Sequence, residues 1–132
     1  MRNITENAVD AFMTNDNFNK QNTKVILFKD DVELKLHGHT IAYKDGADVK
    51  VSFCGWPTVT TKERLNGLLA RIGKNYRFVT RNYDLHVEGF DGWLMKIDDN
   101  KYLSLNMLDQ DHQNYKDDNH VFHGTFNQAD FA

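Results

Sequence analysis

The sequence has very little of what marks secreted or membrane-spanning proteins. Its 132 residues include one cysteine, Cys54, so no disulfide can form within the chain. The longest apolar run is Val25-Ile26-Leu27-Phe28, far short of the ~20 residues that span a bilayer. No apolar stretch near the first residue is long enough for a signal peptide. We therefore expect a soluble protein that stays in the cytoplasm where it is made and does not contact membranes.

Catalytic signatures are also absent from the sequence. The only two serines, Ser52 and Ser104, do not lie in a Gly-x-Ser-x-Gly pattern, and the eight glycines do not form a phosphate-binding loop. Cys54 lies between Phe53 and Gly55, an environment typical of a small buried thiol rather than a nucleophile. We predict a protein that is not an enzyme and needs no cofactor.

What the sequence does have is a globular composition and an uneven charge distribution. Hydrophobic residues make up 40% of the chain and aromatic residues 12%, as in a folded domain. The net charge is −3, yet residues 60–83 carry six basic groups against one acidic group, and residues 84–132 carry three basic against ten acidic. This indicates either a basic binding surface followed by an acidic tail, or two segments that pair with each other, and we favour the pairing.

Hydrophobic periodicity predicts an α+β domain over residues 1–105. Apolar residues recur at helical spacing in residues 5–13, and alternating patterns predict a series of strands between residues 23 and 53 and between residues 76 and 105. The expected fold is one twisted antiparallel sheet of about six to seven strands, packed against one main helix, with a short helix at the N-terminus. Residues 106–132 are polar and acidic and are expected to form a docked C-terminal extension.

The main helix is expected to begin at Thr60, with Glu63 completing a capping box, and to end before Gly73. A hairpin around Arg81-Asn82 follows it. Its alternation predicts one apolar face, formed by Tyr76, Phe78, Tyr83, Leu85 and Val87. On the opposite face, Arg77 and Arg81 are expected to pair with Asp84 and Glu88 across the strands.

Three segments resemble a family of small, functionally uncharacterised proteins of tailed bacteriophages. They are Leu34–Ala42 (LKLHGHTIA), Gly55–Asn66 (GWPTVTTKERLN) and Phe90–Trp93 (FDGW). The family shows a Leu-His-Gly-Asn-x-Ile-Ala strand, a Gly-Trp-x-Thr-x-Thr-Thr-Lys-x-Arg-Leu-Asn loop and helix, and a late Trp-Asp-Gly. The chain departs from it at His39, where asparagine is usual, and at Phe90, where tryptophan is usual. The resemblance covers about residues 22–93 and implies a phage accessory protein in the host bacterial cytoplasm.

A phage protein without catalytic groups is expected to act by binding a host protein, as an inhibitor or a modulator. Within the family motifs, Trp56 is expected to fill part of the core. If its side chain is exposed instead, Trp56 is a candidate interface anchor. The acidic extension can carry a short recognition segment in which neighbouring carboxylates steer a basic partner. Its candidate anchors are Phe122, Phe126 and Phe131.

The alternative is binding of single-stranded nucleic acid, with the acidic extension competing for a basic surface. Such sites combine a positive groove with aromatic platforms for the bases. Alternation places Tyr76 and Phe78 opposite Arg77, however, and a sequence pI of about 6.0 is far from a basic footprint. The candidate contacts are Lys62, Arg64, Arg71, Lys74, Arg77 and Arg81.

Two histidine pairs have spacings that could each supply two nitrogens to a metal, namely His37 with His39 and His120 with His123. A site would require both pairs to meet in space and to be oriented by further hydrogen bonds. Nothing in the sequence demands that meeting, so we expect solvated or hydrogen-bonded histidines and no metal.

Overall fold

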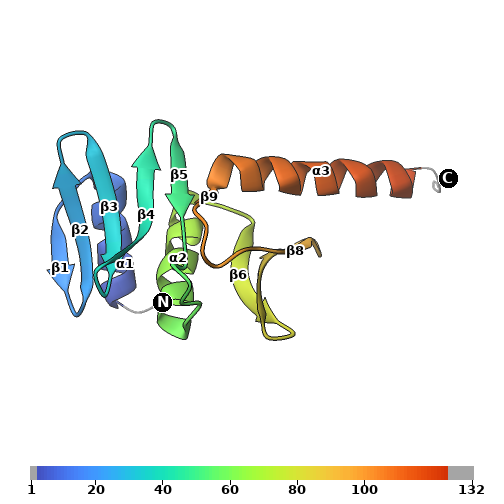
Figure 1. Ribbon diagram of the computed structural model, residues 1–132. Coiled ribbons are helices and arrows are strands. Elements are labelled where there is room, and N and C mark those ends of the chain that lie inside the picture. Colours follow the sequence, from blue (N-terminus) through green and yellow to red (C-terminus); the bar gives the residue numbers. More distant parts are fainter. Residues whose placement is uncertain (1–2, 125–132) are drawn as a thin grey trace.

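The computed structural model describes the backbone of residues 3–124 and the side chains of residues 3–119. It confirms the α+β class and the short N-terminal helix (Figure 1). The elements in chain order are α1 (Asn3–Thr14), β1 (Phe18–Lys20), β2 (Thr23–Phe28), β3 (Asp31–Leu36), β4 (His39–Asp45), β5 (Asp48–Val51), α2 (Val59–Ile72), β6 (Tyr76–Arg81), β7 (Asp84–Gly89), β8 (Leu94–Lys96), β9 (Leu103–Ser104) and α3 (Leu105–Gly124). None of the described helices is both long and apolar enough to cross a membrane.

The strands form two antiparallel sheets. The six-stranded sheet has the order β1-β2-β3-β4-β5-β9, and the three-stranded sheet has the order β6-β7-β8. The division falls at α2, which carries the chain away from β5 before the second hairpin starts. The chain then returns to the first sheet through β9, which pairs Val51 with Leu103. Local alternation predicted the strands other than β1, but the prediction of a single sheet is wrong, because α2 separates β5 from the second hairpin.

Helices α1 and α2 pack on one face of the six-stranded sheet (Figure 1). Their apolar residues meet those of the strands in one core, which includes Phe12, Val25, Leu34, Ile41 and Leu65. No described element covers the other face of this sheet. Phe28 is therefore 64% exposed, since alternation along β2 turns every second side chain away from the helices.

The N-terminus of α2 differs from the prediction. Its N-cap is Thr58, whose Oγ1 accepts a hydrogen bond from the Thr61 N–H at 3.1 Å. The predicted capping box of Thr60 and Glu63 is therefore wrong, because Thr60 lies inside the first turn. The C-terminus is as predicted: Gly73 has a φ of 91°, and its N–H reaches the carbonyl oxygens of the last turn.

Arg64 is buried and joins α2 to α1 and β2. Its guanidinium donates to the hydroxyl of Thr5 at 2.6 Å, to the hydroxyl of Thr23 at 3.3 Å, and to the carboxylate of Glu63 at 2.7 Å. Only 3% of Arg64 is exposed. A buried cation needs such partners, because removing it from water is costly. Arg64 thus holds the helices to the sheet and is not part of an exposed basic surface.

The turn of the second hairpin lies one residue later than predicted. It is formed by Asn82 and Tyr83, with φ of 53° and 68°, and Arg81 pairs with Asp84. A two-residue hairpin turn requires such positive φ angles. Tyr83 therefore leaves the apolar face on which it was expected and is fully exposed. The free edge of β6 is closed by Asn66 of α2, whose side-chain amide bonds both the N–H and the C=O of Phe78.

The acidic extension begins as the helix α3, which projects beyond the body of the protein (Figure 1). Its first turns are held by Leu105, Leu108 and His112, all buried. The His112 ring stacks on Trp93 at a centroid distance of 4.6 Å, and its Nε2 lies 2.8 Å from a carboxylate oxygen of Asp91.

Tyr76 provides a second attachment for α3. Its hydroxyl donates to Asp109 at 2.6 Å. Burial, and then the Asp109 carboxylate, raise the pKa of Tyr76 well above its ordinary value. The phenol therefore stays protonated and keeps donating to Asp109 across the range in which proteins are stable.

Candidate functional site

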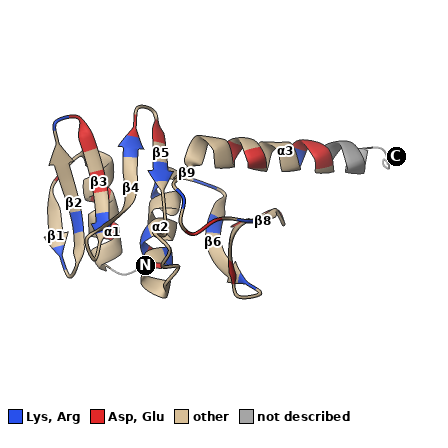
Figure 2. Ribbon diagram, in the orientation of Figure 1, with Lys and Arg blue, Asp and Glu red and all other residues tan. Residues whose placement is uncertain are grey.

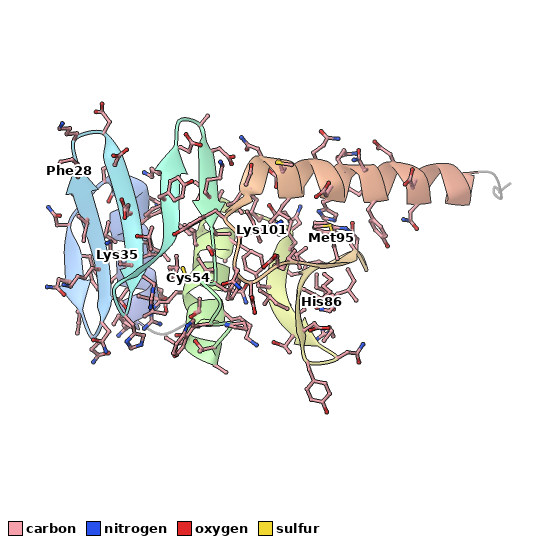
Figure 3. All side chains as sticks on the ribbon, in the orientation of Figure 1. Phe28, Lys35, Cys54, His86, Met95 and Lys101 are labelled. Atoms are coloured by element: carbon pink, nitrogen blue, oxygen red, sulfur yellow. The ribbon has the colours of Figure 1, made fainter. Side chains whose placement is uncertain are left out.

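The candidate site is centred on the loop between β5 and α2. Cys54 and Gly55 have φ of 53° and 77°. The Gly55 N–H donates to the Asp99 carbonyl at 2.6 Å, and the Trp56 N–H donates to the Phe53 carbonyl at 2.8 Å. Figure 3 labels Cys54 between the six-stranded sheet and α2. These bonds fix the direction in which the chain presents the next residue, Trp56.

The backbone conformation at position 55 favours glycine, because its φ of 77° is disfavoured for other residues. The neighbouring Cys54 is half-buried, with its thiol donating to the Thr40 carbonyl at 3.3 Å. Cys54 therefore helps hold the loop against β4.

Large apolar side chains around this loop are exposed. Trp56 is 65% exposed, Val59 is 76% exposed at the start of α2, and Tyr83 is fully exposed at the tip of the β6–β7 hairpin. Pro57 and Tyr83 line the same hollow, which places the hairpin tip beside the loop. We call Trp56, Pro57, Val59 and Tyr83 the Trp56 surface. Exposed aromatic residues on a fixed backbone are typical of interface anchors.

On one side of Trp56 is a hollow of about 460 Å³, here called the apolar hollow. It lies between the β3–β4 turn, the Trp56 loop and the first turn of α2, so two of the three segments that resemble the phage family line it. The described residues that line this hollow include no Lys, Arg, Asp or Glu. The lining residues are Leu36, His37, His39, Ile41, Phe53, Cys54, Trp56, Thr58, Thr60 and Thr61.

A second hollow, of about 470 Å³, opens on the other side of the loop and is here called the acidic hollow. Three carboxylates and one ammonium group line it, so it carries excess negative charge. The ammonium group, Lys96 Nζ, lies 3.3 Å from a carboxylate oxygen of Asp84. The lining residues are Pro57, Tyr83, Asp84, Leu85, Lys96, Ile97, Asp98 and Asp99.

His37 and His39 are exposed at the edge of the apolar hollow. Among the described residues, no group of three or more His, Cys, Asp or Glu side chains could hold a metal ion. The side chains of His120 and His123 lie outside the described residues, as do those of the candidate anchors Phe122, Phe126 and Phe131.

The exposed basic residues of the segment 60–83 are distributed over several elements, interspersed with acidic residues (Figure 2). Arg71 pairs with Asp10 of α1 at 3.0 Å. Lys74 pairs with Asp109 of α3 at 2.6 Å. These two basic residues therefore contact different helices, α1 and α3. The Lys74–Asp109 contact pairs the basic segment with the acidic segment, as we favoured from the sequence.

The remaining basic residues of this segment lie beside the three-stranded sheet. Lys62 donates to the Thr80 hydroxyl at 2.6 Å. Arg77 and Arg81 both contact the Glu88 carboxylate, at 3.4 and 2.9 Å. Their hydrogen bonds, Arg81 first, hold the pKa of Glu88 below its ordinary value. The predicted pairing with Glu88 is therefore present.

Two parts of the site were not found from the sequence. Tyr83 was assigned to the core because the hairpin register was displaced by one residue. The acidic hollow joins Asp84 in one turn to Asp98 and Asp99 in another, and only the fold brings these turns together. The sequence signal that could have placed the hairpin turn correctly was the Asn82-Tyr83 pair. Asparagine is common at positive φ and favours the first position of such a turn.

The architecture is that of a small α+β protein with two hollows beside a fixed, tryptophan-bearing loop. The chain belongs to the Kyanoviridae Gp96 protein family, whose model matches residues 1–121. This confirms the phage resemblance and extends it over α1 and most of α3. No curated protein and no solved structure matches the chain.

Proposed function

We propose that this phage protein acts in the cytoplasm of the host bacterium by binding a host protein through the Trp56 surface. The observation that carries the proposal is the exposure of Trp56 on a loop fixed by backbone hydrogen bonds. Tryptophan and tyrosine are enriched among the few residues that contribute most of the binding energy at interfaces.

The fixed geometry of the loop supports this role. A partner that binds a mobile loop must offset the conformational entropy lost when that loop becomes ordered. Here Gly55 and Trp56 are held by hydrogen bonds before any partner arrives. Most of the conformational entropy of this loop is therefore lost when the protein folds and not when a partner binds. Contacts to the Trp56 indole then contribute more fully to affinity.

The partner's surface is expected to be basic near its contact with the loop. The acidic hollow adjoins Pro57 and Tyr83, and three carboxylates line it. Complementary charge speeds association and excludes acidic competitors. The host protein is therefore expected to present an apolar recess for Trp56 with lysine or arginine at its edge.

The experiment is affinity capture from host lysate with three forms of the full chain: wild type, Trp56→Ala and Phe28→Ala. Phe28 is the matched control, since it is a similarly exposed aromatic residue on β2, well away from Cys54 (Figure 3). We expect one host protein to be retained by wild type and by Phe28→Ala, and lost with Trp56→Ala. Capture that is equal for all three forms, or absent from all of them, contradicts the proposal.

A further inference from the structure

The two hollows on either side of Trp56 define the kind of segment that this surface can accept. We propose that the partner contributes an extended peptide segment that crosses the Trp56-Pro57 loop. It places one large aliphatic or aromatic side chain in the apolar hollow and a lysine or arginine side chain in the acidic hollow. This inference rests on the proposed function and adds the chemistry of the partner.

The apolar hollow suits an uncharged side chain. Its size is within the range of small-ligand pockets. Leu36, Ile41 and Phe53 in its lining are buried and apolar, and none of the lining residues in the described part of the chain is a Lys, Arg, Asp or Glu. A charged occupant would lose its hydration without gaining an ion pair, which is unfavourable. An aliphatic or aromatic side chain has no such strong hydration to lose, and its burial removes apolar surface from water.

The edge of the apolar hollow suits a peptide backbone. Thr60 contributes a hydroxyl group, and His37 and His39 contribute ring nitrogens. These groups can both donate and accept hydrogen bonds without carrying a permanent charge. A peptide brings an N–H and a C=O with every side chain, and each needs a hydrogen bond when it is desolvated. The combination of an apolar interior and such an edge therefore matches a peptide segment.

The acidic hollow selects the second side chain by charge. Asp84 is paired with Lys96, whereas Asp98 and Asp99 add two further carboxylates. The fully exposed ring of Tyr83 also lines this hollow and offers a face to a cation. Since Trp56 lines one hollow and Pro57 the other, a single segment only a few residues long can reach both.

The test is selection of a random peptide library displayed on phage particles against the immobilised full-length chain. Peptides recovered with wild type should carry a large apolar residue and a lysine or arginine within a few positions. A synthetic copy of the most enriched peptide then serves as the probe in fluorescence anisotropy. Wild type is compared with Thr60→Trp, which fills the apolar hollow, and with Asp98→Asn/Asp99→Asn, which removes charge but keeps side-chain shape. Phe28→Ala is the control, and circular dichroism checks that every variant folds.

We expect Thr60→Trp to weaken binding by about tenfold or more, because the apolar side chain loses its buried position. His39→Trp, on the exposed edge of the hollow, should do the same and replaces Thr60→Trp if that variant does not fold. The Asp98→Asn/Asp99→Asn protein should also bind more weakly, and its affinity should depend less on salt. Phe28→Ala should bind as wild type does.

The inference is overturned if no peptide is enriched, or if the enriched peptide binds the filled and charge-depleted variants as well as it binds wild type. Loss of host-protein capture with Trp56→Ala, together with no effect of the filled hollow on peptide binding, would leave the proposed function standing and remove this inference. The converse result is peptide binding that is lost when the hollow is filled, while Trp56→Ala leaves host capture unchanged. That result would support the peptide-binding inference and contradict the proposed function.

Discussion

Replacement of His112 by alanine tests how α3 is held against the three-stranded sheet. The imidazole is 4% exposed, stacks on Trp93 with an interplanar angle of 10°, and contacts the Asp91 carboxylate at 2.8 Å. Tyr76 meets the same ring edge-on at 5.9 Å. Alanine removes all three contacts and leaves a space beside Trp93, so α3 loses one of its polar attachments to the body of the protein.

The expected loss of stability is about 3 kcal/mol. The stacked pair contributes ~1 kcal/mol beyond burial. A hydrogen bond to a charged group contributes ~1.5–3 kcal/mol, which we reduce to ~1 kcal/mol because the Asp91 side chain is 38% exposed and therefore screened by solvent. Loss of the buried ring atoms adds ~1 kcal/mol. With a urea m value of ~2 kcal/mol/M, the unfolding midpoint should fall by about 1.5 M.

Urea unfolding monitored by tryptophan fluorescence measures this, in a Trp56→Phe background so that only Trp93 reports. His39→Ala is the control, because that histidine is exposed, and it should change stability by less than ~0.5 kcal/mol. A loss below ~1 kcal/mol for His112→Ala would refute the reasoning. Trp93 emission should also shift to longer wavelength, since water then reaches the indole face that the imidazole covered.

Four further results are expected. Partial burial raises the pKa of Asp91, but hydrogen bonds, first the one from His112, outweigh this effect and hold the pKa below the ordinary 3.8. The ionised Asp91 therefore contributes stability that is present above pH 3.8 and is lost as the pH falls through the lower pKa of the folded state. Asp91→Asn should remove this contribution, as urea unfolding of both proteins at several pH values will check. Gly89→Ala should destabilise by about 2 kcal/mol in the same assay, because its Cβ would lie 2.6 Å from Asp91 and 3.0 Å from both His112 and Trp93. Thr58→Ala should cost ~1 kcal/mol in thermal unfolding, whereas Thr60→Ala should cost much less, because only Thr58 caps α2. Arg77→Ala/Arg81→Ala should lower stability only slightly, because the ion pairs with Glu88 are exposed. The variant should leave the anisotropy of a labelled single-stranded oligonucleotide at low salt unchanged. Micromolar oligonucleotide binding that this variant abolishes would instead favour the nucleic-acid alternative.

The elements predicted correctly are those whose signals lie within a few residues of one another. Gly73 ends α2 because a left-handed residue is needed there, and glycine is the residue that adopts it most easily. Thr58 was missed as the N-cap because hydroxyl side chains also occur at positions 60 and 61, and the local sequence does not say which of them lies just outside the helix. The sequence therefore predicted the helix but placed its first residue wrongly.

The helix α3 was harder to predict because its buried face is partly polar. Leu105, Leu108 and His112 have helical spacing, but histidine and the many acidic residues around it weaken the apolar pattern. His112 is buried only because Trp93 and Asp91, more than 18 residues earlier in the chain, provide a ring to stack on and a carboxylate to contact. A tertiary contact of this kind leaves no periodic signal in the sequence.

The candidate site depends both on signals that are local in the sequence and on contacts between distant segments. Gly55, Trp56 and Thr58 form a local motif, in which the sequence predicted Trp56 as a core residue and as a candidate anchor only if exposed. Trp56 is 65% exposed, so the predicted burial is wrong. The tip of the β6–β7 hairpin at Tyr83 lies beside Pro57, next to this exposed indole. The same hairpin brings Asp84 to the turn at Asp98 and Asp99, and so creates the excess negative charge of the acidic hollow. The family motifs therefore supply Trp56 and most of the lining of the apolar hollow, whereas the acidic hollow is formed by segments that only the folded chain brings together.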